Sequence, residues 1–278
     1  MSLPEIPVAA PPRVADRIAG APDGAVAVLH ACAGMVHLEL PGVGPGRVVG
    51  VGSAAAAGLP HALRTTLESL PLGRQDPPHN LPTRPGEMSS QALPTAYVES
   101  GILYLGGRAL VARRLVGVRA PRLDAVRIPK ASPVAAMGTP RPRGAGLVAG
   151  PDCVDAGRVV DLVGRGEGLT PWGDDVLCGW LVARRAAGVP TPEVDAAVRQ
   201  ALPRTTALSA TLLECAMAGE AADLVLAYLI ALGAEPGTGS RPVIAAGSAL
   251  RALGHSSGAG LAHGVDLALG RPAGRTAA

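Results

Sequence analysis

Aromatic side chains are almost absent from this chain of 278 residues. It has no Phe, three Tyr and two Trp, so Ala, Val and Leu must fill its interior through many small contacts. Lys130 is the only lysine, the net charge is +3, and no basic cluster contains interleaved aromatic residues. The composition therefore gives little support for nucleic-acid binding.

Metal-type cysteine spacing and long apolar runs are absent as well. The four cysteines are scattered without C-x-x-C spacing, which argues against a zinc site or a disulfide framework. No run of eighteen apolar residues occurs, so no membrane-spanning helix is expected. The first residues lack the charged and apolar regions of a signal peptide. From these absences we expect a cytoplasmic protein that binds neither nucleic acids nor membranes.

The two halves of the chain differ in pattern, and this difference predicts an α+β protein with two domains. Residues 1–150 are predicted to form a β-rich N-terminal domain with a helix over 54–70 and a Pro-rich loop over 71–94. Gly and Pro cluster over 138–151, where we expect the domain boundary. The Val- and Leu-rich runs typical of strands are 25–31, 35–40, 47–52, 97–104 and 109–118.

Residues 151–278 have helical periodicity instead. Their apolar residues recur at steps of three and four, as on the buried face of a helix. The pattern predicts about six or seven helices that pack as a bundle-like, all-helical C-terminal domain. The predicted segments are 154–163, 176–187, 208–216, 224–232, 243–253 and 261–269.

The residues best suited to ligand binding or catalysis are concentrated in residues 164–179, GRGEGLTPWGDDVLCG. Three alternating glycines leave the backbone free to approach a ligand closely. Thr170 and Pro171 predict the N-cap and first position of a helix, which places Asp174 and Asp175 in the first turn. A glycine-rich loop beside two carboxylates at a helix N-terminus indicates binding of phosphate, Mg²⁺, or both.

The same features also have a purely structural interpretation, because capping aspartates and loop glycines are common. No P-loop and no Gly-x-Gly-x-x-Gly after a strand is present. A short likeness to the Gly-x-Gly-Asp turn of ribokinase-like sugar kinases leaves a small-molecule kinase as an alternative. Gly179 lies four residues after Asp175 on the same helix face, where it leaves room for either an ion or a neighbouring backbone.

Three segments resemble, in order and spacing, the AllH-like family. Residues 164–175 resemble its Gly-x-Gly-x-Gly-Leu-Thr-Pro-x-Gly-Asp-Asp signature, and residues 205–220 resemble its Thr/Ser-containing helix that ends in Gly-Glu. Residues 254–258, Gly-His-Ser-Ser-Gly, resemble its late Gly-x-Ser/Thr-Ser-Gly segment. The resemblance covers about residues 151–270, and Gly260 stands where the family usually has an Asp.

This resemblance implies a subunit of an oxamate carbamoyltransferase, which converts oxalurate and phosphate into oxamate and carbamoyl phosphate in allantoin breakdown. Family members accompany two other proteins, so two partner subunits are implied together with a small anionic substrate. A non-catalytic scaffold subunit of such a complex is the alternative from a different functional class, in which the partner proteins carry out the transfer.

The three segments are predicted to form one pocket in the helical domain. Asp174 and Asp175 are the candidate catalytic and Mg²⁺-binding residues. Their side chains diverge by roughly 100° on a helix, so one is expected to bind the ion and the other to cap or orient. His255 is the candidate acid or base, because the reference pKa of His is near neutrality. The predicted substrate contacts are Arg165, Gly166, Gly168, Leu169, Thr170, Gly173, Thr205, Thr206, Ser209, Ser256, Ser257 and Gly258.

Several of these residues also have structural explanations. Capping accounts for one of Thr205 and Thr206. Ser209 lies one turn after Thr205, where a hydroxyl usually bonds back to its own helix. The segment 254–258 is also typical of one helix end followed by the N-cap of the next helix. The sequence leaves the two interpretations open.

Overall fold

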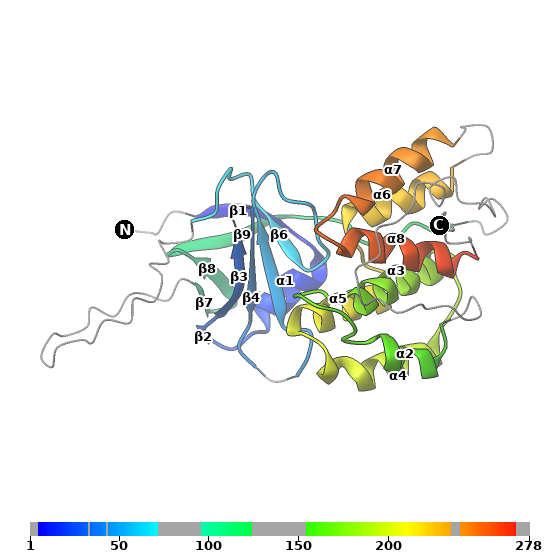
Figure 1. Ribbon diagram of the computed structural model, residues 1–278. Coiled ribbons are helices and arrows are strands. Elements are labelled where there is room, and N and C mark those ends of the chain that lie inside the picture. The colour runs from blue at the N-terminus through cyan, green and yellow to red at the C-terminus, as the bar shows by residue number, and fades with distance from the viewer. Residues whose placement is uncertain are drawn as a thin grey trace, which may run out of the picture. The chain divides into compact units, whose positions relative to one another are not determined.

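The computed structural model describes residues 5–32, 34–42, 44–71, 96–123, 154–234 and 240–270. These residues form two compact units, a β-rich one that takes in most of the chain up to Val116 and a helical one from Gly117 onward (Figure 1). The predicted α+β class is therefore confirmed. The predicted loop over 71–94, apart from Pro71, and the boundary predicted over 138–151 lie outside the described residues.

The β-rich unit contains one sheet of nine strands in the order β2-β7-β8-β9-β1-β6-β5-β4-β3. The edge strands β2 and β3 are consecutive in the chain with only Val26 between them, so the two ends of the sheet approach each other and the sheet is nearly closed. The strands are β1 (Ile6–Ala10), β2 (Gly24–Ala25), β3 (Ala27–Cys32), β4 (Met35–Glu39), β5 (Val48–Gly52), β6 (Ala62–Arg64), β7 (Ala96–Glu99), β8 (Ile102–Leu105) and β9 (Arg108–Leu115).

A single helix, α1 (Pro12–Ala19), completes the core of this unit. Val14 and Ile18, one turn apart on α1, are buried in one hydrophobic cluster with strand residues such as Leu38 and Leu103. Apart from His37 on β4, the buried strand residues are small or branched aliphatic side chains, as the lack of aromatic residues requires. Neither α1 nor β1 was among the elements predicted from the sequence.

Two other predictions in this unit need correction. The helix predicted over 54–70 is wrong, because the segment contributes strand β6, which pairs with both β1 and β5. Pairing inside a sheet overrides the helix preference of Ala and Leu. The run 97–104 is a hairpin and not one strand, since Ser100 and Gly101 adopt positive φ between β7 and β8.

The helical unit contains seven α-helices within the described residues. Each of the six predicted segments corresponds to one of them, whereas α4 was missed although Val194, Val198 and Ala201 form a buried stripe behind Pro192. No helix in the described part of the chain is long and apolar enough to cross a membrane. The helices are α2 (Ala156–Leu162), α3 (Trp172–Ala186), α4 (Pro192–Ala201), α5 (Ala207–Met217), α6 (Asp223–Leu232), α7 (Arg241–Arg251) and α8 (Ser257–Ala268), with a 3-10 turn at Leu202–Arg204.

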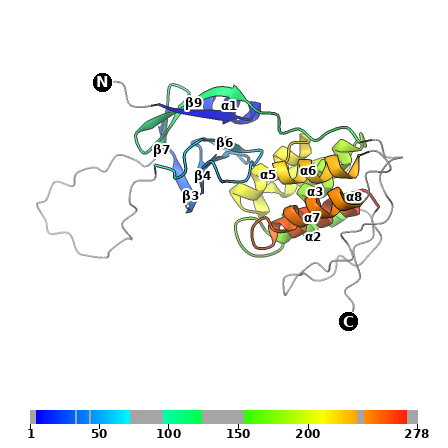
Figure 2. The ribbon, with the colours of Figure 1, turned by 90° about the horizontal axis from the view of Figure 1, so that it is seen from above.

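Helices α3 and α8 lie side by side, and their contact is the most extensive between any two helices in the described part of the chain (Figures 1 and 2). A Cβ atom at Gly179 would lie 2.1 Å from the carbonyl oxygen of Leu261, and one at Gly264 would lie 2.0 Å from that of Val176. The glycines therefore allow backbone-to-backbone contact. Of the two interpretations of Gly179, the structure supports the neighbouring backbone and not the space for an ion.

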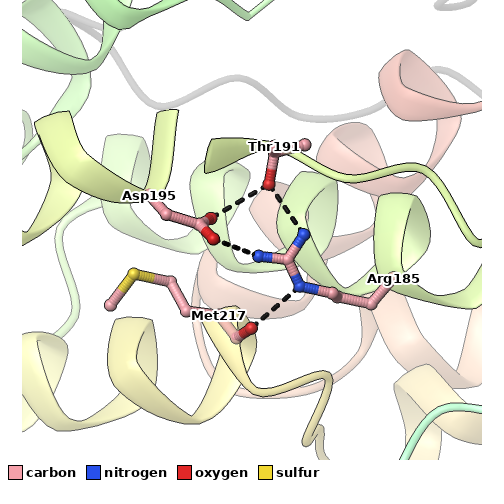
Figure 3. A network of polar contacts seen from close by, with 4 residues as sticks. All are labelled: Arg185, Thr191, Asp195 and Met217. Carbon is pink, nitrogen blue, oxygen red and sulfur yellow. Dashed lines mark hydrogen bonds and ion pairs between the residues drawn. The ribbon is translucent and has the colours of Figure 1, made fainter. Parts of the chain in front are cut away.

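The C-terminal end of α3 is held by one arginine (Figure 3). The Arg185 guanidinium donates to the carbonyl oxygen of Met217 at 2.9 Å and to the hydroxyl of Thr191 at 2.8 Å. It also forms an ion pair with Asp195 on α4. Because one planar group satisfies three partners, it ties the ends of α3 and α5 to the start of α4.

Candidate functional site

Asp174 joins the glycine-rich loop to the start of helix α5. Its Oδ1 accepts a hydrogen bond from the backbone N–H of Gly164 at 2.9 Å, and its Oδ2 accepts one from the Thr205 hydroxyl. Burial raises the pKa of Asp174, and the hydrogen bonds from Thr205 and Gly164 oppose this rise. Since both carboxylate oxygens have partners in other segments, Asp174 holds three parts of the chain together.

The neighbouring carboxylate, Asp175, lies against helix α8. Its Cβ would be only 2.8 Å from a Cβ placed on Gly260, and the Ser257 hydroxyl interacts with its carboxyl group. Burial raises the pKa of Asp175 well above its usual value, Ser257 lowers it, and the charge of Asp174 adds to the rise. The Oδ2 atom is buried and has no hydrogen-bond partner among the described residues.

The three polar segments meet at the N-termini of three helices. The Thr170 and Ser257 hydroxyls lie 2.7 Å apart, which links the loop before α3 to the first residue of α8. The Thr206 hydroxyl donates to the Leu169 carbonyl at 2.6 Å and accepts from the Ser209 N–H at 3.0 Å, which caps α5. The loop that precedes α3 is therefore bonded to the starts of both α5 and α8.

Glycines in this region differ in what surrounds them. Gly164 and Gly166 have positive φ, and a Cβ on them would lie 2.5 Å and 2.7 Å from backbone atoms of Arg204 and Trp172. Gly168 also has positive φ but has open space around its Cβ position. The backbone conformation thus favours glycine at all three positions, and among them Gly168 alone has open space beside it within the described residues.

Gly173 and Gly258 are sites of close packing. A Cβ on Gly173 would lie 2.0 Å from the Leu162 carbonyl oxygen, and one on Gly258 would lie 1.9 Å from that of Leu250. Both glycines therefore have a structural reason to be present. Their predicted contact with a substrate stays a prediction.

Five of the predicted site residues, including Arg165 and His255, lie on the surface. Arg165, Gly166, Gly168 and Leu169 are exposed, and so is His255 in the turn between α7 and α8. Within the described residues, neither Arg165 nor His255 forms a hydrogen bond with the two aspartates. Their roles as an anion contact and as an acid or base stay predictions.

The detailed roles of three hydroxyls differ from those expected. Helix α3 begins at Trp172 with Pro171 at the N-cap position, so Thr170 is not the cap, and its hydroxyl pairs with Ser257 instead. Ser256 occupies the N-cap position of α8 but makes no side-chain cap bond. The Ser209 hydroxyl lies 3.5 Å from the Leu169 carbonyl outside its own helix, so it does not bond back.

Two contributors to the site were not among the predicted residues. The Gly164 N–H donates to Asp174, and the alternating glycine run that contains Gly164 was the signal that could have found it. Trp172 lies beside the Gly260 position and stacks on His263 with ring centroids 6.3 Å apart. No sequence signal links Trp172 to α8, because the two segments meet only in the folded unit.

A Mg²⁺ ion would find few protein ligands here. Asp174 has both oxygens engaged, and Asp175 offers one. The described part of the chain contains no group of three His, Cys, Asp or Glu residues that could hold a metal. Because Mg²⁺ is often held by one or two carboxylates plus substrate oxygens, the predicted ion would depend on ligand oxygens at this site.

The comparison with known families concerns the part of the chain that carries this site. Residues 162–269 match the protein family described as oxamate carbamoyltransferase subunit AllH. This part of the chain is similar to the AllH family. The AllH match begins at the last residue of α2 and ends just after α8, so it includes all three polar segments. No curated protein and no solved structure shows a significant match.

The structure also shows where the departure from the AllH-like pattern lies. A side chain at Gly260, where the resemblance implies an Asp, would meet Asp175 at 2.8 Å and the Trp172 ring at 3.2 Å. The position that differs is thus directly beside the carboxyl group that has an unpartnered oxygen. In this chain, Gly260 allows α8 to approach Asp175 closely.

Proposed function

We propose that this chain is a subunit of an oxamate carbamoyltransferase-like system, and that its helical unit binds the small anionic substrate. The AllH match supports the first part. The observation that carries the second is the bonding of the loop before α3 to the starts of α5 and α8. The N–H groups and dipole of a helix N-terminus favour a bound anion, and here three N-termini adjoin one exposed loop.

The proposed chemistry follows from this arrangement. Transfer of a carbamoyl group between oxamate and phosphate moves negative charge onto oxygen atoms in the transition state. Backbone N–H groups fixed at helix N-termini stabilise such charge without having to reorient. Arg165 in the exposed loop would add a bidentate contact to the anion, and His255 would transfer protons. A Mg²⁺ ion bound to the unpartnered oxygen of Asp175 is the alternative use of that atom, and its other ligands would then come from the substrate.

The wider setting is part of the same proposal. The subunit would act in the cytoplasm, in allantoin breakdown, together with two partner subunits. The second candidate is a scaffold subunit that contributes no chemistry, which the AllH match fits equally because it names only a subunit of the transferase.

A titration tests the proposal and separates it from its rivals. Both tryptophans, Trp172 and Trp180, lie on α3, so their fluorescence reports on this site. The full-length chain would be titrated with phosphate, carbamoyl phosphate and ATP, with and without Mg²⁺. We expect a saturable response to phosphate and carbamoyl phosphate that is lost in an Asp174→Asn/Asp175→Asn double variant.

The matched control is Asp155→Asn at the N-cap of α2, where Asn caps as well as Asp and the response should persist. A response to none of the ligands would contradict substrate binding and favour the scaffold. A response to ATP alone would favour the small-molecule kinase.

A further inference from the structure

The two adjacent carboxylates have different surroundings. This difference indicates a separate role for each of them in the proposed function, on which this inference rests. We propose that Asp175 accepts a hydrogen bond from the N–H₂ end of the substrate, whereas Asp174 only positions the loop. Asp175 would then be the residue that distinguishes an N–H₂ group from a methyl group of nearly the same size in an otherwise similar anion.

Asp174 is fully used by the protein itself. Its two oxygens bond to Gly164 in the loop and to Thr205 before α5. A ligand would have to replace one of these bonds to reach it, and the loop would then lose its anchor. Asp174 is therefore a positioning residue.

Asp175 has an unused acceptor. Its side chain is 4% exposed, and its Oδ2 atom is buried without a hydrogen-bond partner within the described residues. Leaving a carboxylate oxygen buried and unpaired costs free energy, so such atoms in native proteins call for a partner. An N–H donor on a ligand supplies that partner and favours the ionised carboxylate.

The surroundings of Asp175 define what else the ligand carries. Asp175 lies in the first turn of α3, and Ser257, which interacts with it, is the first residue of α8. Both helix ends favour an anion. A ligand that suits both the free oxygen and the helix ends has an N–H₂ group adjacent to an oxyanion, as oxamate and carbamoyl phosphate do. It would enter between Thr170 and Ser257, which are half-buried and joined by a single hydrogen bond.

Pairs of ligands that differ only at this group test the proposal. Oxamate and pyruvate have the same charge and nearly the same shape, but pyruvate has a methyl group in place of N–H₂. Carbamoyl phosphate and acetyl phosphate differ in the same way. In calorimetric titrations of the full-length chain, we expect the N–H₂ member of each pair to bind about 30-fold more tightly, the usual effect of one hydrogen bond to a charged group.

The same substitution at the two neighbouring positions separates their roles. Asp175→Asn should reduce the preference for oxamate over pyruvate to about threefold or less, because the new amide can present a donor in place of the acceptor. Asp174→Asn should weaken both ligands by a similar factor and keep their ratio. N,N-dimethyloxamate, which has no N–H, should bind the unaltered chain as weakly as pyruvate, a test that depends on no variant.

Each other result would overturn the proposal. Equal binding of oxamate and pyruvate would refute the role of Asp175 while leaving the anion site in place. A preference for oxamate that survives Asp175→Asn would show that the free oxygen binds no ligand. A preference that disappears when EDTA is added would assign that oxygen to a cation. No binding of any of the ligands would overturn the proposed function as well.

Discussion

At the scale of single residues, Asp174 and Asp175 show how the partner opposite a side chain determines its role. Both are buried acids in the first turn of α3, and burial raises the pKa of each. Hydrogen bonds from Thr205 and Gly164 compensate for the burial of Asp174, whereas one oxygen of Asp175 has no partner among the described residues. Removing a partner from Asp174 should therefore destabilise the fold.

Replacing Thr205 should show how much its hydrogen bond to Asp174 contributes to stability. Thr205→Val keeps the shape of the side chain but removes the hydroxyl that donates to Asp174. We expect the helical unit to lose about 2 kcal/mol of unfolding free energy, because a buried acceptor loses its donor. Urea unfolding followed by tryptophan fluorescence measures this loss. Thr205→Ser keeps the hydroxyl and should remain within about 1 kcal/mol of the unaltered chain; equal losses in both variants would contradict the explanation.

At the scale of elements, the close contact of α3 and α8 determines the geometry of the site. Gly179 and Gly264 bring the two backbones together, and this approach places Ser257 beside Asp175 and Thr170. Any side chain between the helices would separate them. The position of the polar residues thus depends on small residues further along the same two helices.

Gly179→Ala tests this dependence. Its Cβ would lie 2.1 Å from the Leu261 carbonyl, so the helices must move apart. We expect a destabilisation of about 3 kcal/mol, although Ala is the better helix former, because strain between packed backbones exceeds the gain in propensity.

The matched control is Gly157→Ala on α2, where the glycine is exposed and the new Cβ would approach only the Asp155 side chain, at 3.3 Å. This variant should unfold at the same or a slightly higher temperature than the unaltered chain, because Ala favours the helix. If thermal melts show the same change for both variants, the close contact of α3 and α8 is not the cause.

At the scale of the whole molecule, the two units have separate hydrophobic clusters and opposite responses to acid. In the β-rich unit, burial and the nearby His30 lower the pKa of His37 from 6.5 to about 4. In the helical unit, burial raises the pKa of Asp174 and Asp175. Because protonation affects each unit through its own buried groups, pH should change their relative stabilities.

The direction of each pH effect on stability follows from the difference in proton binding between the folded and the unfolded chain. The folded β-rich unit binds a proton at His37 less readily than the unfolded chain does, so the stability that neutral His37 contributes is present above pH 6.5 and lost as the pH falls towards 4. The full loss is about 3 kcal/mol, since one pKa unit corresponds to about 1.4 kcal/mol. The raised pKa values of Asp174 and Asp175 act in the opposite sense: their contribution is present below the unfolded value of 3.8 and lost as the pH rises through the folded values.

Thermal melts at pH 7.5 and pH 5 measure this effect. Tryptophan fluorescence follows the helical unit alone, because both tryptophans lie on α3, whereas far-ultraviolet circular dichroism follows both units. On acidification, the β-rich unit should melt at a lower temperature relative to the helical unit. His37→Gln should abolish most of this acid shift, and an unchanged shift in that variant would exclude His37 as its source.

Local signals in the sequence were enough to predict six of the seven described helices of the helical unit, and the polar cluster, but neither α4 nor α1. The helical periodicity beyond residue 151 and the glycines, threonine and aspartates of residues 164–175 depend on neighbours within one or two turns. Their joining to Thr205 and to Ser257 also agrees with the predicted meeting of the three segments. The ligands of that site remain to be measured.

The sequence by itself determined the α+β class, the helical segments it marked with apolar stripes, and the glycine- and aspartate-rich start of α3, because these follow from short-range periodicity and composition. Only the tertiary structure decided that residues 62–64 form a strand, that Gly179 meets a neighbouring backbone, and that Thr170 pairs with Ser257. It also decided which of the two aspartates has an oxygen without a partner in the described part of the chain. Each of these depends on a partner far away in the chain, whose position is set only when the sheet and the helices pack.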